Sequence, residues 1–127
     1  MDRRHYEKSK SDEDYLKNIL ILRCKNGHVR ATDIAAALGV TKPSVSVAMK
    51  KLRGLQMISI DSKGNICLTE EGQAVAERIY HKHRLIKELL MHIGVSEKTA
   101  SEEACLIEHI IGEETFDRLE VIYGRMV

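Results

Sequence analysis

The segment SEEACLIEHII, near the end of the 127-residue chain, contains three side chains that can bind a metal ion. Cys105, Glu108 and His109 stand at positions i, i+3 and i+4, and a helix would bring all three to one face. A thiolate, a carboxylate and an imidazole within one turn suit Fe²⁺, Mn²⁺, Co²⁺ or Zn²⁺ better than Ca²⁺ or Mg²⁺. Alternatively, Cys105 is a small core residue and the other two are ordinary surface groups. The spacing alone leaves both interpretations open.

A second set of residues lies in the stretch DIAAALGVTKPSVSVAMKKL and has the composition of a DNA-binding surface. Gly39 and the capping residue Thr41 separate two short helical segments, in the order typical of a helix-turn-helix. Hydroxyl side chains and lysines near a helix N-terminus can reach base edges and phosphates in a major groove. The expected DNA-binding residues are Thr41, Lys42, Pro43, Ser44, Ser46, Lys50, Lys51 and, on the wing, Lys63. The alternatives are a merely solvated lysine-rich face or a protein-binding module, since winged helices serve both purposes.

The periodicity of apolar residues predicts the elements that position both sets. Spacings near 3.6 residues indicate helices, whereas the alternation of apolar and polar residues after Gly54 indicates a short β-hairpin. The predicted order is a flexible basic arm over 1–10, helices over 11–25, 33–39 and 42–54, a hairpin over 58–68, and helices over 69–93, 97–111 and 113–123. The chain is therefore expected to be mainly α with a small β-hairpin wing. Residues 1–68 would form the arm and the winged helix-turn-helix DNA-binding domain, and residues 69–127 a helical metal-binding and dimerisation domain.

The charge distribution agrees with this division. The net charge is only +1, but the residues through Leu68 hold 13 Lys and Arg against 7 Asp and Glu, and the remainder holds 7 against 12. A basic first half suits a polyanion such as DNA, and an acidic second half suits cations or a partner subunit. No apolar run approaches the roughly 20 residues of a membrane helix. The three cysteines have no disulfide-framework spacing, so we expect a cytoplasmic protein with reduced thiols and no membrane contact.

Three motifs, E-D-Y-L, K-H-R-L and E-A-C-x-x-E-H, give the chain a specific resemblance that extends from Glu13 to about Val121. The chain resembles the iron- and manganese-dependent repressors of the diphtheria toxin repressor and manganese transport regulator family, in its short form without an SH3-like domain. The resemblance implies a homodimer that binds palindromic operators in double-stranded DNA, with a divalent metal ion as corepressor.

The resemblance also implies a ligand set. It places a first-helix ligand on Asp14 and further ligands on Cys105, Glu108 and His109, with a cysteine as in the iron branch and an aspartate as in the manganese branch. Asp14 also stands three residues after Ser11, where it could simply be the acidic member of a capping box.

Other positions depart from the family pattern. His83 matches a histidine that serves an auxiliary or second ion, but Lys87 and Ser101 stand where the iron branch has its partners. Lys17 replaces a second helix-one glutamate of the manganese branch. We therefore expect one divalent transition metal ion per subunit, Fe²⁺ or Mn²⁺, with Co²⁺, Zn²⁺ or Ni²⁺ able to replace it in vitro. His83 is expected to be either a hydrogen-bonding residue or a marginal metal ligand.

The sequence thus predicts a metal-dependent DNA-binding repressor that controls metal homeostasis. The alternative is a winged-helix regulator that senses a thiol oxidant through Cys105, or a small molecule, instead of a metal ion. An enzyme is disfavoured, because no segment of so short a chain supplies an evident general base or oxyanion site.

Overall fold

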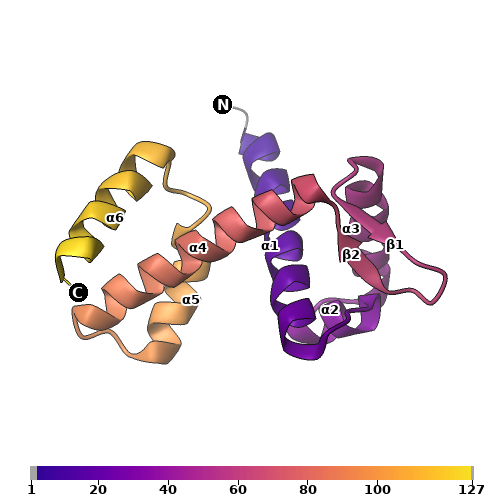
Figure 1. Ribbon diagram of the computed structural model, residues 1–127, viewed down its shortest axis with the longest axis horizontal. Coiled ribbons are helices and arrows are strands. Elements are labelled where there is room, and N and C mark those ends of the chain that lie inside the picture. Colours follow the sequence, from indigo (N-terminus) through magenta and orange to yellow (C-terminus); the bar gives the residue numbers. More distant parts are fainter. Residues whose placement is uncertain (1–2, 127) are drawn as a thin grey trace. The chain divides into compact units, whose positions relative to one another are not determined.

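Two compact units make up the computed structural model, which describes residues 3–126 and, within them, the side chains of residues 11–126. The first unit extends to Glu77 and contains α1 (Arg3–Asn26), α2 (Ala31–Leu38), α3 (Lys42–Gly54), β1 (Ile58–Ile60), β2 (Ile66–Leu68) and the start of α4 (Glu70–His92) (Figure 1). The second unit begins at Arg78 and contains the rest of α4, α5 (Glu97–Ile107) and α6 (Glu113–Met126). This division falls inside α4, and the expected domain boundary after residue 68 stays a prediction.

Helix α1 is longer than the sequence indicates. It begins at Arg3, so the prediction of a flexible arm over 1–10 is wrong for residues 3–10, while residues 1 and 2 lie outside the described residues. The reason is local: this stretch contains neither glycine nor proline to interrupt a helix. Ser11 is consequently an interior residue of α1, which removes the capping-box explanation of Asp14.

The helix-turn-helix has the expected turn. Gly39 ends α2 in the left-handed conformation at φ 66°, and the Thr41 hydroxyl oxygen accepts the N–H of Ser44 at 3.3 Å to cap α3. At the start of α2, the N–H of Arg30 donates to the Asp33 carboxylate at 2.8 Å. The buried face of α3 consists of Val45, Met49 and Leu52.

The hairpin pairs β1 and β2 antiparallel, with Ile58 opposite Leu68 and Ile60 opposite Ile66. A further backbone bond joins it to the loop after α1, since the Ile66 N–H donates to the carbonyl oxygen of Val29 at 2.8 Å. In the turn, hydrogen bonds from the backbone N–H of Asn65, and more weakly from that of Lys63, hold the pKa of Asp61 below its usual value. The wing is thus a hydrogen-bonded turn that presents Lys63 to solvent.

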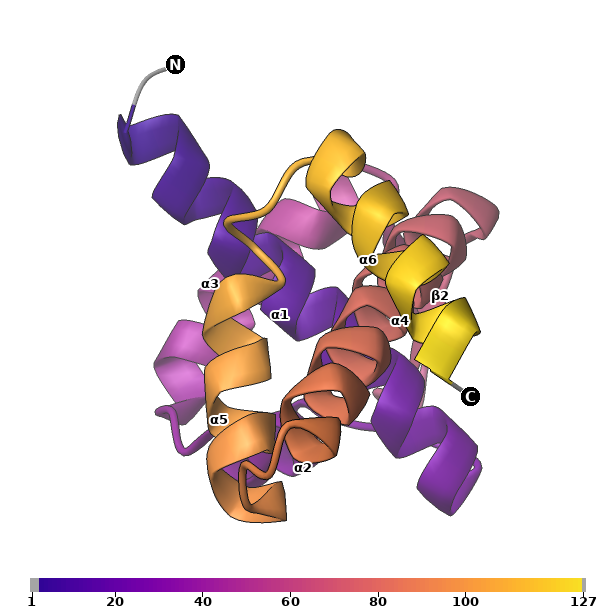
Figure 2. The same ribbon diagram turned by 90° about the vertical axis from the view of Figure 1, so that its left-hand side faces the viewer.

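In the second unit, α5 and α6 both contact α4 (Figure 2). The α6 contact centres on the buried Phe116 ring, which meets the His81 ring edge-on at 5.4 Å and lies 5.6 Å from the ammonium nitrogen of Lys82. Helix α5 ends at Ile107 instead of the predicted 111, and α6 continues past the predicted 123 to Met126. Among the described residues, no helix has the length and apolarity to cross a membrane.

Candidate metal centre and DNA-binding surface

The C-terminal end of α5 brings the predicted metal-binding residues together. Cys105 lies in the last turn, and Glu108 caps the helix in right-handed helical conformation, with its N–H donating to the carbonyl oxygen of Ala104 at 3.0 Å. Because the backbone stays helical for this one residue, the i, i+3 relation survives although the helix itself ends at Ile107. The predicted proximity of Cys105 and Glu108 is therefore present, one residue beyond the helix and not within it.

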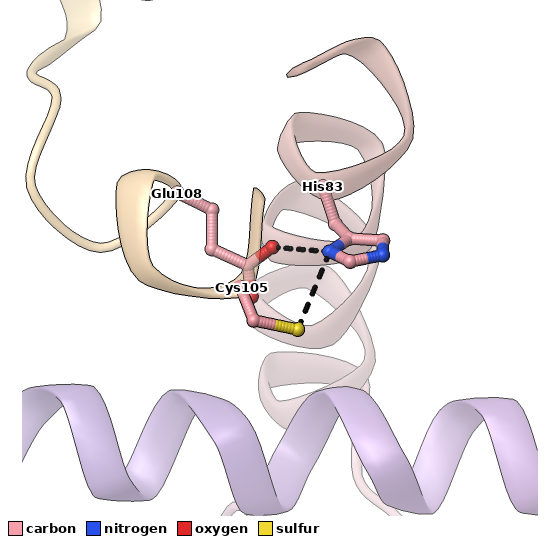
Figure 3. A group of neighbouring side chains, drawn as sticks. All are labelled: His83, Cys105 and Glu108. Atoms are coloured by element: carbon pink, nitrogen blue, oxygen red, sulfur yellow. Dashed lines mark hydrogen bonds and ion pairs between the residues drawn. The ribbon is translucent and has the colours of Figure 1, made fainter. Parts of the chain in front are cut away.

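Glu108 forms the centre of the cluster. Its side chain is fully buried, and one carboxylate oxygen, Oε2, lies 2.8 Å from Nδ1 of His83 on α4 (Figure 3). The other oxygen, Oε1, lies 3.3 Å from Nε2 of His109. A buried carboxylate is costly unless charged or polar groups compensate it, and here two imidazoles do so on opposite oxygens.

Cys105 completes the set. Its Sγ lies 3.7 Å from Nδ1 of His83, so His83 faces both the thiol and the carboxylate (Figure 3). One donor atom from each of His83, Cys105 and Glu108 lies within 4.8 Å of the others. Sulfur, oxygen and imidazole nitrogen converging at partly buried positions form a donor set that fits a transition metal ion, and hard Ca²⁺ or Mg²⁺ would prefer oxygen alone.

His83 has the hydrogen-bonding contact that the sequence leaves open, and its role as a metal ligand stays a prediction. The expectation of a marginal residue rested on Lys87 and Ser101, and at that place Lys87 is paired with Glu97 at 3.4 Å. The His83 ring instead contacts Glu108 and Cys105. The signal was available in the sequence, because the spacing of Ile79, His83 and Ile86 puts all three on one face of α4, and both isoleucines are buried.

Asp14 lies on α1, in the first unit. Its Oδ1 lies 3.8 Å from the ammonium nitrogen of Lys17, whose side chain is only 4% exposed. The Lys17 ammonium would repel a metal ion bound by Asp14, because like charges repel strongly away from water. The role of Asp14 as a metal ligand stays a prediction.

Most of the predicted DNA-binding residues, all of which belong to the first unit, are exposed. Those that are exposed are Thr41, Lys42, Pro43, Ser44, Ser46, Lys50 and Lys63. Lys51 differs, because its ammonium nitrogen lies 2.7 Å from the Asp12 carboxylate on α1 and its side chain is 31% exposed. This ion pair joins α3 to α1 and occupies the Lys51 ammonium group, so we expect a weaker phosphate contact from Lys51 than from Lys50. The DNA-binding role of Lys51 stays a prediction.

Comparison with known proteins settles the family. Residues 8–57 match the N-terminal DNA-binding domain of iron-dependent repressors, and residues 69–126 match their metal-binding and dimerisation domain. The chain belongs to the iron-dependent repressor family. The match of residues 69–126 includes the whole His83, Cys105, Glu108 and His109 cluster.

Individual proteins are similar to this chain over most of its length. An uncharacterised helix-turn-helix transcriptional regulator of Methanocaldococcus jannaschii is 38% identical over 89% of this chain and 92% of its own length. The crystal structure of IdeR from T. acidophilum is 35% identical with a TM-score of 0.80, and covers 88% of this chain. The structure of the manganese regulator SloR is 33% identical with a TM-score of 0.79, and covers 89%. The chain spans about half the length of these two solved chains, 53% of each.

Proposed function

We propose that this protein is a metal-dependent transcriptional repressor that controls metal homeostasis, with Fe²⁺ or Mn²⁺ as its corepressor. The observation that carries the proposal is the fully buried Glu108 carboxylate, held between His83 and His109 and next to Cys105. The second domain of this family is described as metal-binding, and this donor set is the site that we propose for the ion. Iron is named in the family description and manganese in the name of SloR.

The ion would be held by His83, Cys105 and Glu108. We propose His109 as a ligand next to this set, because its Nε2 lies 3.3 Å from the other Glu108 oxygen. Asp14 is proposed as a further ligand on the family resemblance. The thiol distinguishes this set from an all-oxygen site, and favours Fe²⁺, Co²⁺ and Zn²⁺ over Mn²⁺ in vitro. We infer one ion per subunit, because Lys17 places an ammonium beside Asp14 where a second divalent ion would need negative charge.

Repression requires a link between the cluster and the DNA-binding surface. Helix α4 begins in the first unit, where the Thr69 hydroxyl before it donates to the Gln56 carbonyl oxygen at 2.7 Å, and it carries His83 in the second. An ion bound by ligands on both units would favour the conformers in which the two α3 helices of a dimer match successive major grooves, roughly 34 Å apart.

A homodimer is the proposed form. The second unit exposes large apolar side chains at the end of α4, at the end of α5 and on α6; these are Met91, Ile93, Leu106, Ile110, Val121 and Ile122. Exposed apolar groups in this number mark an interaction surface, and the family description assigns dimerisation to this region. A symmetric dimer with one α3 per subunit would bind a palindromic operator in double-stranded DNA, within the cytoplasm.

The test is a mobility-shift assay with duplexes that the protein itself enriches from a random pool in the presence of Mn²⁺. Binding is then measured in chelator and after anaerobic addition of Mn²⁺, Fe²⁺, Co²⁺ or Zn²⁺. We expect strong stimulation by metal, and loss of that stimulation in Glu108→Ala with the dimer still folded. Equal binding in chelator and metal would refute metal dependence. If binding then responded only to peroxide, the thiol-oxidant alternative would replace it.

A further inference from the structure

Val47 is an unusual residue on the exposed surface of α3. Its side chain is 70% exposed, although every other large apolar side chain described in α3 belongs to the buried face of Val45, Met49 and Leu52. Successive helical residues are about 100° apart, so Val47 projects about 200° from Val45, on the opposite side of the helix. The valine therefore adds little to the core, and its β-branched side chain is a less favourable choice in an exposed helix than alanine or lysine.

The surroundings of Val47 are those of a surface that enters a groove. Pro43 precedes it by one turn on the same line of α3, Ser44 and Ser46 lie on either side, and Lys50 follows by one turn, all of them exposed. Short side chains allow the backbone of α3 to approach the bases closely, and Lys50 can reach phosphate. An apolar group in the middle of this line can form no hydrogen bond to a base edge.

The chemistry of the major groove supplies one apolar partner. Among the four bases only thymine presents a methyl group there, at C5, where cytosine has only a hydrogen atom; the other groups that specify the bases are hydrogen-bond donors and acceptors. We propose that Val47 packs against a thymine methyl group in each half of the operator and thereby selects T·A over C·G at that position. This inference rests on the proposed binding of α3 in the major groove, and assigns to Val47 a specificity role that the polar residues of α3 do not fill.

The test removes the methyl group alone. In the duplex enriched with the metal-loaded, full-length protein, each symmetric pair of thymines is replaced in turn by deoxyuridine, which lacks only the C5 methyl group. Burial of one methyl group strengthens binding about fourfold. Replacing the pair of thymines that Val47 contacts, one in each half-site, should therefore weaken binding about fifteenfold. Val47→Ala should lose affinity for the thymine duplex and bind the thymine and deoxyuridine duplexes alike at that position.

Two controls separate a methyl contact from other effects. Ser46→Ala, an exposed neighbour of Val47, should keep the discrimination against deoxyuridine whatever its own affinity. At the same position, replacing T·A by C·G should weaken binding by the wild type. Replacing that cytosine by 5-methylcytosine should restore part of the lost affinity in the wild type but not in Val47→Ala. This coupling between one side chain and one methyl group is what a double-mutant cycle isolates.

The outcomes are distinguishable. Wild-type binding that is indifferent to deoxyuridine at every position, or an equal deoxyuridine penalty in Val47→Ala, would overturn the role of Val47 while leaving metal-dependent repression intact. Failure to enrich any duplex with metal would overturn the proposed function itself, and the inference with it. Because Val47 is exposed and alanine is the better helix former, Val47→Ala should melt no lower than the wild type and keep the dimer mass, which confirms that the comparison is between folded proteins.

Discussion

Replacing His83 by alanine removes one of the two imidazoles that contact the buried Glu108 carboxylate. Without metal, the change deletes a 2.8 Å interaction with a group whose side chain is fully buried. A hydrogen bond to a charged group contributes about 1.5–3 kcal/mol, and burial of the remaining carboxylate favours the upper part of that range. The free energy of unfolding in chelator, measured with urea, should therefore fall by about 2–3 kcal/mol.

The same substitution should reduce metal affinity strongly. Loss of a residue that only orients a ligand costs about 10–100-fold, so loss of a ligand should reach at least the upper end, about 100-fold or 2.7 kcal/mol. Co²⁺ competition titrations report the dissociation constant, and absorption from thiolate to Co²⁺ shows whether Cys105 still binds. The effect should lie within about tenfold of that of His109→Ala, because both rings contact the same carboxylate.

His81 offers a matched control on the same helix. It lies two residues before His83, its side chain is 57% exposed, and it contacts Glu120 at 3.2 Å, away from the cluster. His81→Ala should leave Co²⁺ affinity unchanged. If His83→Ala retained Co²⁺ affinity within threefold of wild type while His109→Ala lost it, the assignment of His83 to the metal centre would be wrong.

Four further outcomes follow from the same structure. Lys50→Ala should weaken binding to all duplexes and reduce the slope of log affinity against log salt by about one unit per subunit, whereas Lys51→Ala should alter that slope less; equal slopes in both variants would contradict the distinction. Gly72→Ala should destabilise the protein by more than about 1 kcal/mol in urea unfolding, because a Cβ at this position would overlap the carbonyl oxygen of Met57; wild-type stability would contradict the close approach. Sedimentation at micromolar concentration without metal should give about 29 kDa, twice the 14.4 kDa chain, and a clean monomer would count against the dimer. Lys17→Glu should raise the metal content above one ion per subunit in elemental analysis, and an unchanged value of one would show that Lys17 does not limit the stoichiometry.

The sequence predicts the order of elements well because each is marked locally. The left-handed Gly39, the Thr41 cap and the change of period at the hairpin need only neighbouring residues to be recognised. The errors are also local in origin. Ile110 and Ile111 continue the apolar period of α5, but both N–H groups bond to the Ile107 carbonyl oxygen in a turn that ends the helix.

The side-chain contacts that the sequence does not predict are those between residues distant in the chain. Nothing near Lys51 indicates that its ammonium group pairs with Asp12, 39 residues earlier. Likewise, the position of His83 between two buried isoleucines indicates an inward orientation, but its partners Cys105 and Glu108 follow only once α5 is packed on α4. Long-range packing therefore decides which titratable residues meet, and local pattern decides only which faces they occupy.

The two lysines that depart from the family pattern have a common consequence. Lys17 and Lys87 stand where the resemblance implies ligands of additional ions, and each is paired with a carboxylate, Asp14 at 3.8 Å and Glu97 at 3.4 Å. An ammonium group supplies positive charge at these places permanently, so an additional ion would find no uncompensated negative charge there. In the proposed protein, only the cluster around Glu108 would then respond to metal concentration. A single responsive centre per subunit makes DNA binding depend on one metal equilibrium, and that dependence is set by the thiol and imidazoles that α4 and α5 bring together.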